Sequence, residues 1–232
     1  MSAKDELVYV VERDGLFSDV KCYPQGFIAV GTETFDLMVP HVAGGYFMDR
    51  PIAEADWSMK QIIPYCLLTL GSVGGGRVVW LMQRKGGGEK RLEGSYYIGV
   101  GGHINPCDAT DVFHCGGTVE EWALQRELEE ELRFCRQADF ASDLQTEPLS
   151  YEEWWQKTGP HRPKPKLIGL INDDSNPVGA VHLGMVYHLE IPSAWRPVTE
   201  DPGRWEAPYS IRQMHTGVCE TWTQLIICGG AL

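Results

Sequence analysis

The segment 118–134 constrains the fold most strongly, because it predicts a capped helix with a buried stripe. Thr118 is followed three residues later by Glu121, which is the capping-box pattern of a helix N-terminus. Trp122, Leu124 and Leu128 then recur at spacings that allow one face to be buried. The sequence therefore predicts an amphipathic helix that packs against a core.

Another face of this helix carries three carboxylates. Glu127, Glu130 and Glu131 stand at i, i+3 and i+4, so they lie within about one turn of each other. Such charges repel one another unless something neutralises them, and Mg²⁺ and Mn²⁺ prefer hard oxygen ligands. A solvated acidic face is the alternative, because runs of charge usually face water. Arg126 beside the cluster and the glycine-rich IGVGGHIN upstream favour a metal site.

The residues Arg-Glu-Leu-Glu-Glu-Glu at 126–131 resemble the core of the Nudix box. That box has a glycine, five residues, a glutamate, seven residues, arginine-glutamate, an aliphatic residue, any residue and two glutamates. GGHI at 101–104 resembles its opening glycines, and QRKGGGEKRLEGSYYIGVGG resembles the strand, loop and strand before it. The chain is therefore identified, over residues 62 to 228, as a variant member of the Nudix hydrolase superfamily.

The box departs from the family pattern in three places. Gly102 precedes Arg126 by 24 positions, where the pattern has 14, so we interpret NPCDATDVFH and its neighbours as ten extra loop residues. Thr118 stands in place of the early glutamate. Arg133 replaces the late glycine and is followed by the expected apolar residue, Phe134. These changes leave the water-activating base as the least determined part of the site.

The resemblance implies an α/β fold, a Nudix-type α/β/α sandwich with a mixed β-sheet. It also implies that Glu127, Glu130 and Glu131 bind Mg²⁺ or Mn²⁺, and that the carbonyl of Gly102 completes the metal shell. Bound ions would bridge the two phosphates of a substrate and lower the pKa of an attacking water. Arg126 would orient the glutamates through paired hydrogen bonds.

Three further residues are predicted to serve the substrate. Glu200 is the first candidate for the water-activating carboxylate, with four alternatives, namely Asp201, Glu206, Asp173 and Asp174. Arg84 ends the strand before the glycine loop, where Nudix proteins often place a basic residue, and we expect it to meet a phosphate. His103 follows Gly102 directly, so we expect it near the metal site and the substrate.

Two regions are predicted along the chain. Residues 1–60 form an N-terminal β-containing extension with loops, and residues 61–232 form the Nudix domain. Within the domain we expect a hairpin, a loop that holds one short helix, two more strands and a closing helix. These elements are Ile62–Leu70 with Arg77–Gln83 around Gly71–Gly76, then Gln145–Pro165, then Leu167–Ile171 and Val181–Ile191, and then Cys219–Cys228.

The composition of the chain argues against several classes of binding partner. The net charge of −12 disfavours nucleic acids and anionic membranes, which need a basic surface. No apolar run reaches the roughly 20 residues that span a bilayer. The N-terminus lacks the apolar stretch of a signal peptide, and seven scattered cysteines indicate reduced thiols, so we expect a cytoplasmic protein. A homodimer is expected only on general grounds.

The sequence predicts a divalent-metal-dependent pyrophosphohydrolase that cleaves a phosphoanhydride bond in a nucleoside diphosphate derivative or a similar diphosphate. A non-catalytic Nudix-like nucleotide sensor is the first alternative, although such proteins usually lose the glutamate pair that this chain keeps. An isoprenyl-diphosphate isomerase is the second. That branch needs a cysteine before the glycine, where this chain has Gly101. The substrate itself is not predicted.

Overall fold

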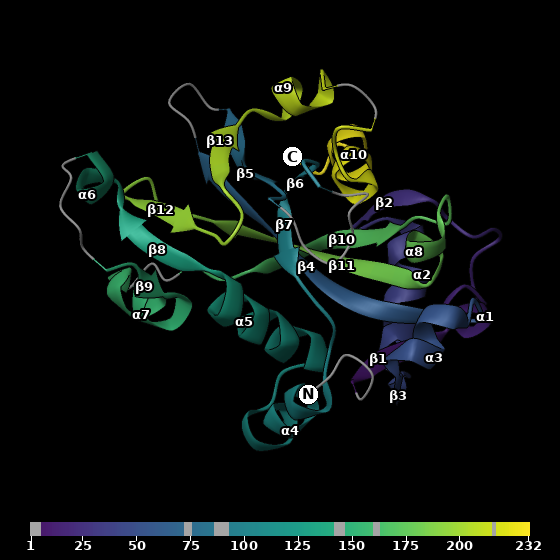
Figure 1. The fold of residues 1–232 in the computed structure, drawn as a ribbon. Coiled ribbons are helices and arrows are strands. Elements are labelled where there is room, and N and C mark those ends of the chain that lie inside the picture. The colour runs from purple at the N-terminus through teal and green to yellow at the C-terminus, as the bar shows by residue number, and fades with distance from the viewer. Residues whose placement is uncertain (1–5, 72–75, 86–92, 142–146, 160–162, 215–216) are drawn as a thin grey trace.

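The computed structural model describes residues 6–71, 76–85, 93–141, 147–159, 163–214 and 217–232 (Figure 1). Its strands are β1 (Leu7–Glu12), β2 (Gly26–Ala29), β3 (Tyr46–Asp49), β4 (Met59–Gly71), β5 (Arg77–Gln83), β6 (Tyr96–Tyr97), β7 (Gly99–Gly101), β8 (Arg133–Arg136), β9 (Leu149–Ser150), β10 (Lys166–Asn172), β11 (His182–Glu190), β12 (Trp195–Val198) and β13 (Gly203–Glu206). Its helices are α1 (Arg13–Leu16), α2 (Glu33–Val42), α3 (Arg50–Ala55), α4 (Pro106–Cys115), α5 (Val119–Glu131), α6 (Gln137–Ala141), α7 (Tyr151–Lys157), α8 (Pro177–Ala180), α9 (Pro208–Arg212) and α10 (Thr221–Cys228).

One large mixed sheet organises the molecule. Its strand order is β13-β5-β4-β11-β10-β2, with β7 and β1 also paired to β4, β6 paired to β5, and β3 paired to β1. β11 runs parallel to β4 and antiparallel to β10, so the sheet is mixed. A smaller sheet has the order β12-β8-β9. The predicted hairpin is confirmed, because β4 and β5 pair antiparallel from Thr69 with Val79 to Gly71 with Arg77. Most of its turn, 72–75, lies outside the described residues.

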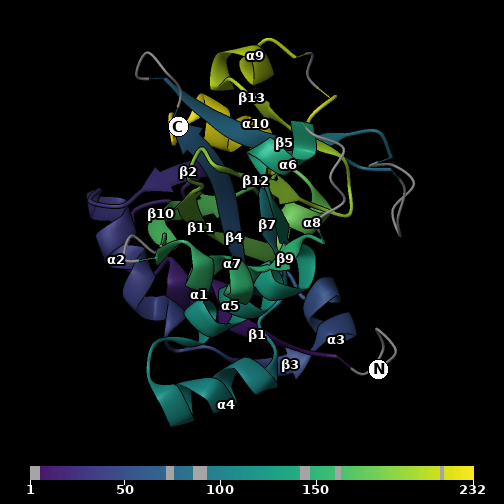
Figure 2. The ribbon, with the colours of Figure 1, turned by 90° about the vertical axis from the view of Figure 1, so that its left-hand side faces the viewer.

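Helices cover both faces of the large sheet (Figures 1 and 2). Alternate residues of β4 divide between two hydrophobic clusters, since successive side chains of a strand point to opposite faces. Ile62 and Cys66 share one cluster with Leu124 and Leu128 of α5, and Tyr65 shares the other with residues of α10. Burial of β4 on both faces explains its continuous apolar sequence. The predicted α/β/α sandwich with a mixed sheet is confirmed.

The N-terminal residues join the same sheet. β1 pairs antiparallel with β4, and β2 pairs antiparallel with β10, so the extension contains strands as predicted. The prediction of loops in this extension was incomplete, because α2 and α3 form after β2. Thr32 caps α2 by accepting a hydrogen bond from the backbone N–H of Phe35, and Pro51 lies in the first turn of α3. The boundary at residue 60 stays a prediction.

The interpretation of the ten extra residues as a loop was wrong. They form helix α4, at whose start the Asp108 carboxylate accepts from the backbone N–H of Asn105 and Pro106 occupies the first helical position. The predicted capping box of α5 is confirmed, with the Thr118 side chain accepting from the N–H of Glu121. The predicted short helix within 145–165 is α7, and the predicted closing helix is α10. None of the helices in the described part of the chain is long and apolar enough to cross a membrane.

Candidate functional site

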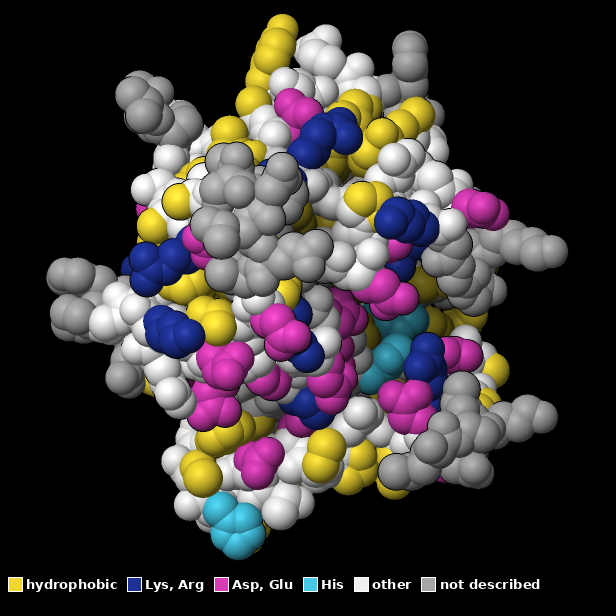
Figure 3. Space-filling model, turned by 60° about the vertical axis from the view of Figure 1, so that its left-hand side comes forward, with side chains coloured by type: hydrophobic (Ala, Val, Ile, Leu, Met, Phe, Trp, Pro, Cys, Tyr) yellow, Lys and Arg dark blue, Asp and Glu magenta, His cyan; other side chains and the backbone are white. Residues whose placement is uncertain are grey.

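Helix α5 carries the three predicted metal ligands and packs on one face of the large sheet, against β4 and β7. Glu127 is buried at 8% exposure, because it lies on the side of α5 that faces the loop after β7. The Glu130 side chain is 58% exposed, and Glu131 is also exposed. Acidic side chains gather at the middle of one molecular face, with histidine side chains beside them (Figure 3).

Burial and neighbouring negative charges raise the pKa values of Glu127 and Glu131. Burial raises the pKa of Glu127, and the negative charges of Glu130 and Asp108 add to this effect against the opposing charge of Arg126. Glu131 is exposed to solvent, but the protein atoms near its carboxylate exclude part of the water around it. This desolvation, followed by the charge of Glu127, raises the pKa of Glu131 to about 7. The cluster thus lacks enough positive charge to stabilise its ionised form.

Arg126 lies at the centre of the contacts around this cluster. Its Nη1 donates to Oε1 of Glu127 at 2.7 Å and to Oε2 of Glu130 at 3.4 Å. Its Nη2 donates to the backbone carbonyl of His103 at 2.8 Å, which joins α5 to the loop after β7. Burial alone would lower the pKa of Arg126, but its hydrogen bonds with Asp108 and the charge of Glu127 raise it.

Asp108 is a site residue that sequence reasoning missed. It is 1% exposed and receives two hydrogen bonds from the Arg126 guanidinium, from Nε to Oδ1 at 3.0 Å and from Nη2 to Oδ2 at 3.1 Å. Its Oδ2 also accepts from the backbone N–H of Asn105 at 2.8 Å. The pattern Asn105-Pro106-Cys107-Asp108, a capping box with proline at the first helical position, was the available signal.

Gly102 lies directly against the carboxylate of Glu127. A Cβ atom built on Gly102 would come within 2.6 Å of Oε1 and 2.7 Å of Oε2 of Glu127. Only a residue without a side chain leaves the buried carboxylate in this position. The structure therefore brings Gly102, Arg126 and Glu127 together, with Glu130 and Glu131 on the outer side of the same helix.

The donor types and the charge of this cluster fit a divalent cation. Carboxylate oxygens are the ligands that Mg²⁺ and Mn²⁺ prefer, and three carboxylates within about one helical turn repel one another unless positive charge lies between them. Within the described residues, however, no three His, Cys, Asp or Glu side chains are already arranged to hold a metal ion. Glu127 is hydrogen-bonded to Arg126 instead, so metal binding would require side-chain rotation.

Arg84 is held by two side chains, those of Glu220 and Tyr97. Its Nε donates to Oε1 of Glu220 at 2.6 Å, and its guanidinium carbon lies 4.4 Å from the ring centroid of Tyr97. The Arg84 side chain is still 39% exposed, and its charge acts against the rise in the pKa of Glu131. Glu220 lies 136 residues later in the chain, so this contact was not visible in the sequence.

The candidates for the water-activating carboxylate fall in different places. Glu200 is exposed and near enough for its charge to raise the pKa of Glu131. Asp201 beside it is held, because it accepts from the Tyr97 hydroxyl at 2.8 Å and from the backbone N–H of Lys85 at 3.0 Å. Glu206 pairs with Arg204 at 3.1 Å.

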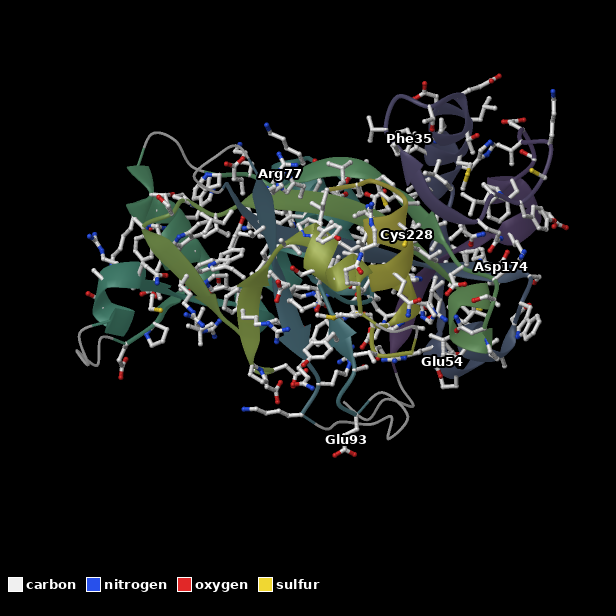
Figure 4. The ribbon with its side chains drawn as sticks, turned by 90° about the horizontal axis from the view of Figure 1, so that it is seen from above. Phe35, Glu54, Arg77, Glu93, Asp174 and Cys228 are labelled. Carbon is white, nitrogen blue, oxygen red and sulfur yellow. The ribbon has the colours of Figure 1, made fainter. Side chains whose placement is uncertain are left out.

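Asp173 and Asp174 lie elsewhere. Asp174 binds Arg13 at 2.6 Å and the buried ammonium of Lys60 at 2.8 Å, beside the N-terminal elements (Figure 4). Asp173 accepts from the backbone N–H and the hydroxyl of Ser175, as expected of a residue that shapes a turn. Among the predicted candidates, Glu200 is therefore the one whose charge is among the causes that raise the pKa of Glu131.

His103 lies at the rim of the acidic cluster beside a second histidine. Its ring centroid is 5.6 Å from that of His182, and its Nε2 atom is buried with no hydrogen-bond partner among the described residues. Burial, together with the positive charges of Arg50, His182 and Arg126, lowers the pKa of His103 to about 3. The ring is therefore neutral at physiological pH and can donate or accept one hydrogen bond at each nitrogen.

Comparisons with known proteins identify the fold and the family. No protein-family model matches the chain. Protein YmaB of Bacillus subtilis (strain 168) is 30% identical over 233 residues, which cover 98% of this chain and 98% of YmaB. The crystal structure of Tm1382, a protein proposed to be a Nudix hydrolase, has a TM-score of 0.63 and 22% identity and covers 97% of both chains. The predicted Nudix recognition is confirmed at the level of the fold. The chain therefore belongs to the same family as Bacillus subtilis YmaB and has the fold of the Nudix hydrolases.

Proposed function

We propose that this protein is a divalent-metal-dependent hydrolase that cleaves a phosphoanhydride bond in a nucleoside diphosphate derivative or a similar diphosphate. The observation that carries the proposal is the group of Glu127, Glu130 and Glu131 on one side of α5, with pKa values of Glu127 and Glu131 raised by partly buried negative charge. Three carboxylates this close together repel one another in water. They can instead bind divalent cations, which also bind the oxygens of a substrate phosphate.

In this proposal Glu127, Glu130 and Glu131 hold Mg²⁺ or Mn²⁺, with the carbonyl of Gly102 as a further ligand. Bound ions would neutralise the diphosphate and lower the pKa of the attacking water. Arg126 positions the cluster, because it joins Glu127 and Glu130 to the carbonyl of His103. Hydrolysis forms one bond from the water oxygen to phosphorus and breaks one P–O bond of the anhydride.

The remaining chemistry comes from side chains around the acidic cluster. Glu200 would accept the proton of the attacking water, since it is a free carboxylate whose charge reaches Glu131. Arg84 would bind a phosphate oxygen with the guanidinium nitrogens that Glu220 leaves open. His103, which is neutral, would donate a hydrogen bond to the substrate. These residues bind, orient and deprotonate, and they require no covalent intermediate.

A substrate panel in Mg²⁺ or Mn²⁺ tests the proposal. Nucleotide sugars, nucleoside triphosphates, dinucleoside polyphosphates and prenyl diphosphates are incubated with the full chain, and both phosphate products and isomer ratios are measured. Turnover of a diphosphate with a loss of at least about a thousandfold in Glu130→Gln supports the assignment. Glu33→Gln, on the exposed first turn of α2, is the matched control. Binding without turnover would favour the nucleotide sensor, and a loss below about tenfold in Glu130→Gln would contradict the metal-ligand assignment.

A further inference from the structure

A cavity lies beside a different face of α5 from the three predicted metal ligands. It has a volume of about 550 Å³ and lies between α5, α7 and the C-terminal end of α4. This volume is within the range of pockets that bind small molecules. Figure 2 shows α7 beside α5. Glu127, Glu130 and Glu131 do not line the cavity, so it is separate from the proposed active site.

Aromatic side chains from three elements line this cavity. Trp122 comes from α5, Tyr151 and Trp155 from α7, and Tyr187 from β11. Trp122 is fixed, because its indole N–H donates to the carbonyl of Gly116 at 2.7 Å. The face of an aromatic ring carries partial negative charge and attracts cations. This attraction is stronger where the cation is shielded from water, as it would be inside a cavity.

Two buried tyrosine side chains line the cavity, and the described residues leave their hydroxyls unpaired. Tyr151 is 7% exposed and Tyr187 is 5% exposed, and both line the cavity. Among the described residues, neither hydroxyl forms a hydrogen bond that would satisfy it. Neither hydroxyl is among the fully buried polar atoms that lack a partner, so both are open to the cavity. The two hydroxyls can therefore bind a polar group of a ligand there.

The charged side chains around the cavity are mainly acidic. Glu121, Glu129 and Glu152 line it, with Lys164 as the one basic side chain on its described walls. Within the part of the chain that the structure describes, no ion pair neutralises these three glutamates. Glu129 is oriented by the backbone N–H of Glu152, which donates to its Oε2 at 2.8 Å. Burial first, and then the charges of Glu120 and Glu121, raise the pKa of Tyr187.

We propose that this cavity binds a small organic ammonium compound. The ammonium group would lie between the aromatic faces of Trp122 and Trp155 and the carboxylates of Glu129 and Glu152, and the tyrosine hydroxyls would bind its polar substituents. The negative charge at the cavity disfavours a phosphate there. The ligand therefore differs in chemistry from the diphosphate proposed for the other face of α5.

Titration of the full chain with choline and with phenethylammonium tests this proposal. Each is compared with an uncharged analogue of the same shape, in which a carbon or hydroxyl group replaces the ammonium. Binding is followed by NMR of the indole N–H groups. We expect the signals of Trp122 and Trp155 to move with the charged compounds, while the signal of the exposed Trp57 does not. Equal binding of the uncharged analogues, or no binding of either cation up to about 10 mM, would overturn the proposal.

Charge-removing variants locate the ligand. Glu129→Gln removes the charge but preserves the shape of the side chain, and it is expected to weaken binding of the cation about tenfold. If this variant is unstable, Glu152→Gln tests the same expectation. Glu33→Gln on α2 is the matched control and should bind as the unmodified chain does. Glu130→Gln should also keep its affinity, which separates this site from the proposed active site. Unchanged affinity in both Glu129→Gln and Glu152→Gln would contradict the assignment.

Discussion

Arg126 binds both carboxylate oxygens of Asp108, with distances of 3.0 Å from Nε to Oδ1 and 3.1 Å from Nη2 to Oδ2. Asp108 belongs to α4, and α4 is formed by the ten residues between Gly102 and Arg126 that the usual Nudix box lacks. The same arginine holds Glu127 at 2.7 Å. The inserted helix therefore takes part in positioning the acidic cluster, rather than forming an appendage beside it.

Asp108→Asn should destabilise the protein by about 2 kcal/mol, because a buried acceptor for a charged guanidinium loses its charge. Catalytic activity should fall as well, since the amide nitrogen that replaces one carboxylate oxygen cannot accept a hydrogen bond and Arg126 would lose one of the contacts that orient it. Urea unfolding and turnover measure the two effects. The exposed Asp111 on the same helix supplies the control, and Asp111→Asn should stay within about 0.5 kcal/mol of the unmodified chain. A stability change this small in Asp108→Asn would show that the pair is unimportant.

Gly102→Ala should reduce activity about a hundredfold while changing stability little. The new Cβ would lie 2.6 Å from the Glu127 carboxylate, whose flexible end can move away at low cost but then leaves its position beside Arg126. Gly15→Ala is the matched control, because a Cβ there meets Glu12 at an ordinary 3.8 Å. Thermal unfolding and initial rates separate the effects. Full activity in Gly102→Ala would mean that Glu127 does not need this position.

Local signals explain what could be predicted from the sequence. The capping box of α5 depends on Thr118 and Glu121, three residues apart, and the acidic face depends on the helical spacing of its glutamates. The pairing of β4 with β5 follows from two apolar runs that are close in the chain. Such short-range patterns identify an element and its faces without knowledge of the tertiary structure.

Long-range contacts explain what could not be predicted. The partner of Arg84 is Glu220, and the partner of Tyr97 is Asp201, so each pair depends on the complete fold. The case of α4 is different, because its capping signal at Asn105 was local. Comparison with the family pattern makes these residues an insertion and predicts a loop. The local pattern of Asn105, Pro106 and Asp108 is typical of a helix N-terminus and agrees with the structure.

Arg84→Gln should raise KM about tenfold and change kcat much less. This is the result expected when Arg84 binds the phosphate equally well in the substrate complex and in the transition state. Arg77→Gln is the matched control, since it removes the same charge at the far end of β5 (Figure 4). Steady-state kinetics on the best substrate of the panel give both constants. A fall in kcat with an unchanged KM would assign Arg84 to the transition state instead.

The pair of Lys60 and Asp174 should make stability depend on pH at the acidic end. Lys60 is fully buried, and its Nζ lies 2.8 Å from Oδ1 of Asp174 and 3.0 Å from the carbonyl of Gly179. Burial lowers the pKa of Lys60 to about 8, so the ammonium is charged at pH 6. Burial alone would raise the pKa of Asp174, but the hydrogen bond and charge of Lys60 lower it below the ordinary 3.8.

A carboxyl group with a lowered folded-state pKa stabilises the protein above its unfolded pKa and loses that contribution as pH falls through the folded value. Asp174→Asn should therefore cost about 3 kcal/mol at pH 6, where it leaves Lys60 charged and unpaired by a carboxylate. The difference from the unmodified chain should shrink as pH falls below 3.8, where the unfolded state takes up the proton first, and it should vanish below the lower folded-state pKa of Asp174, where both states are protonated. Denaturant unfolding at a series of pH values measures this, with the exposed Asp36→Asn as control. A difference that stays constant down to pH about 2 would show that the ion pair does not determine the stability at this position.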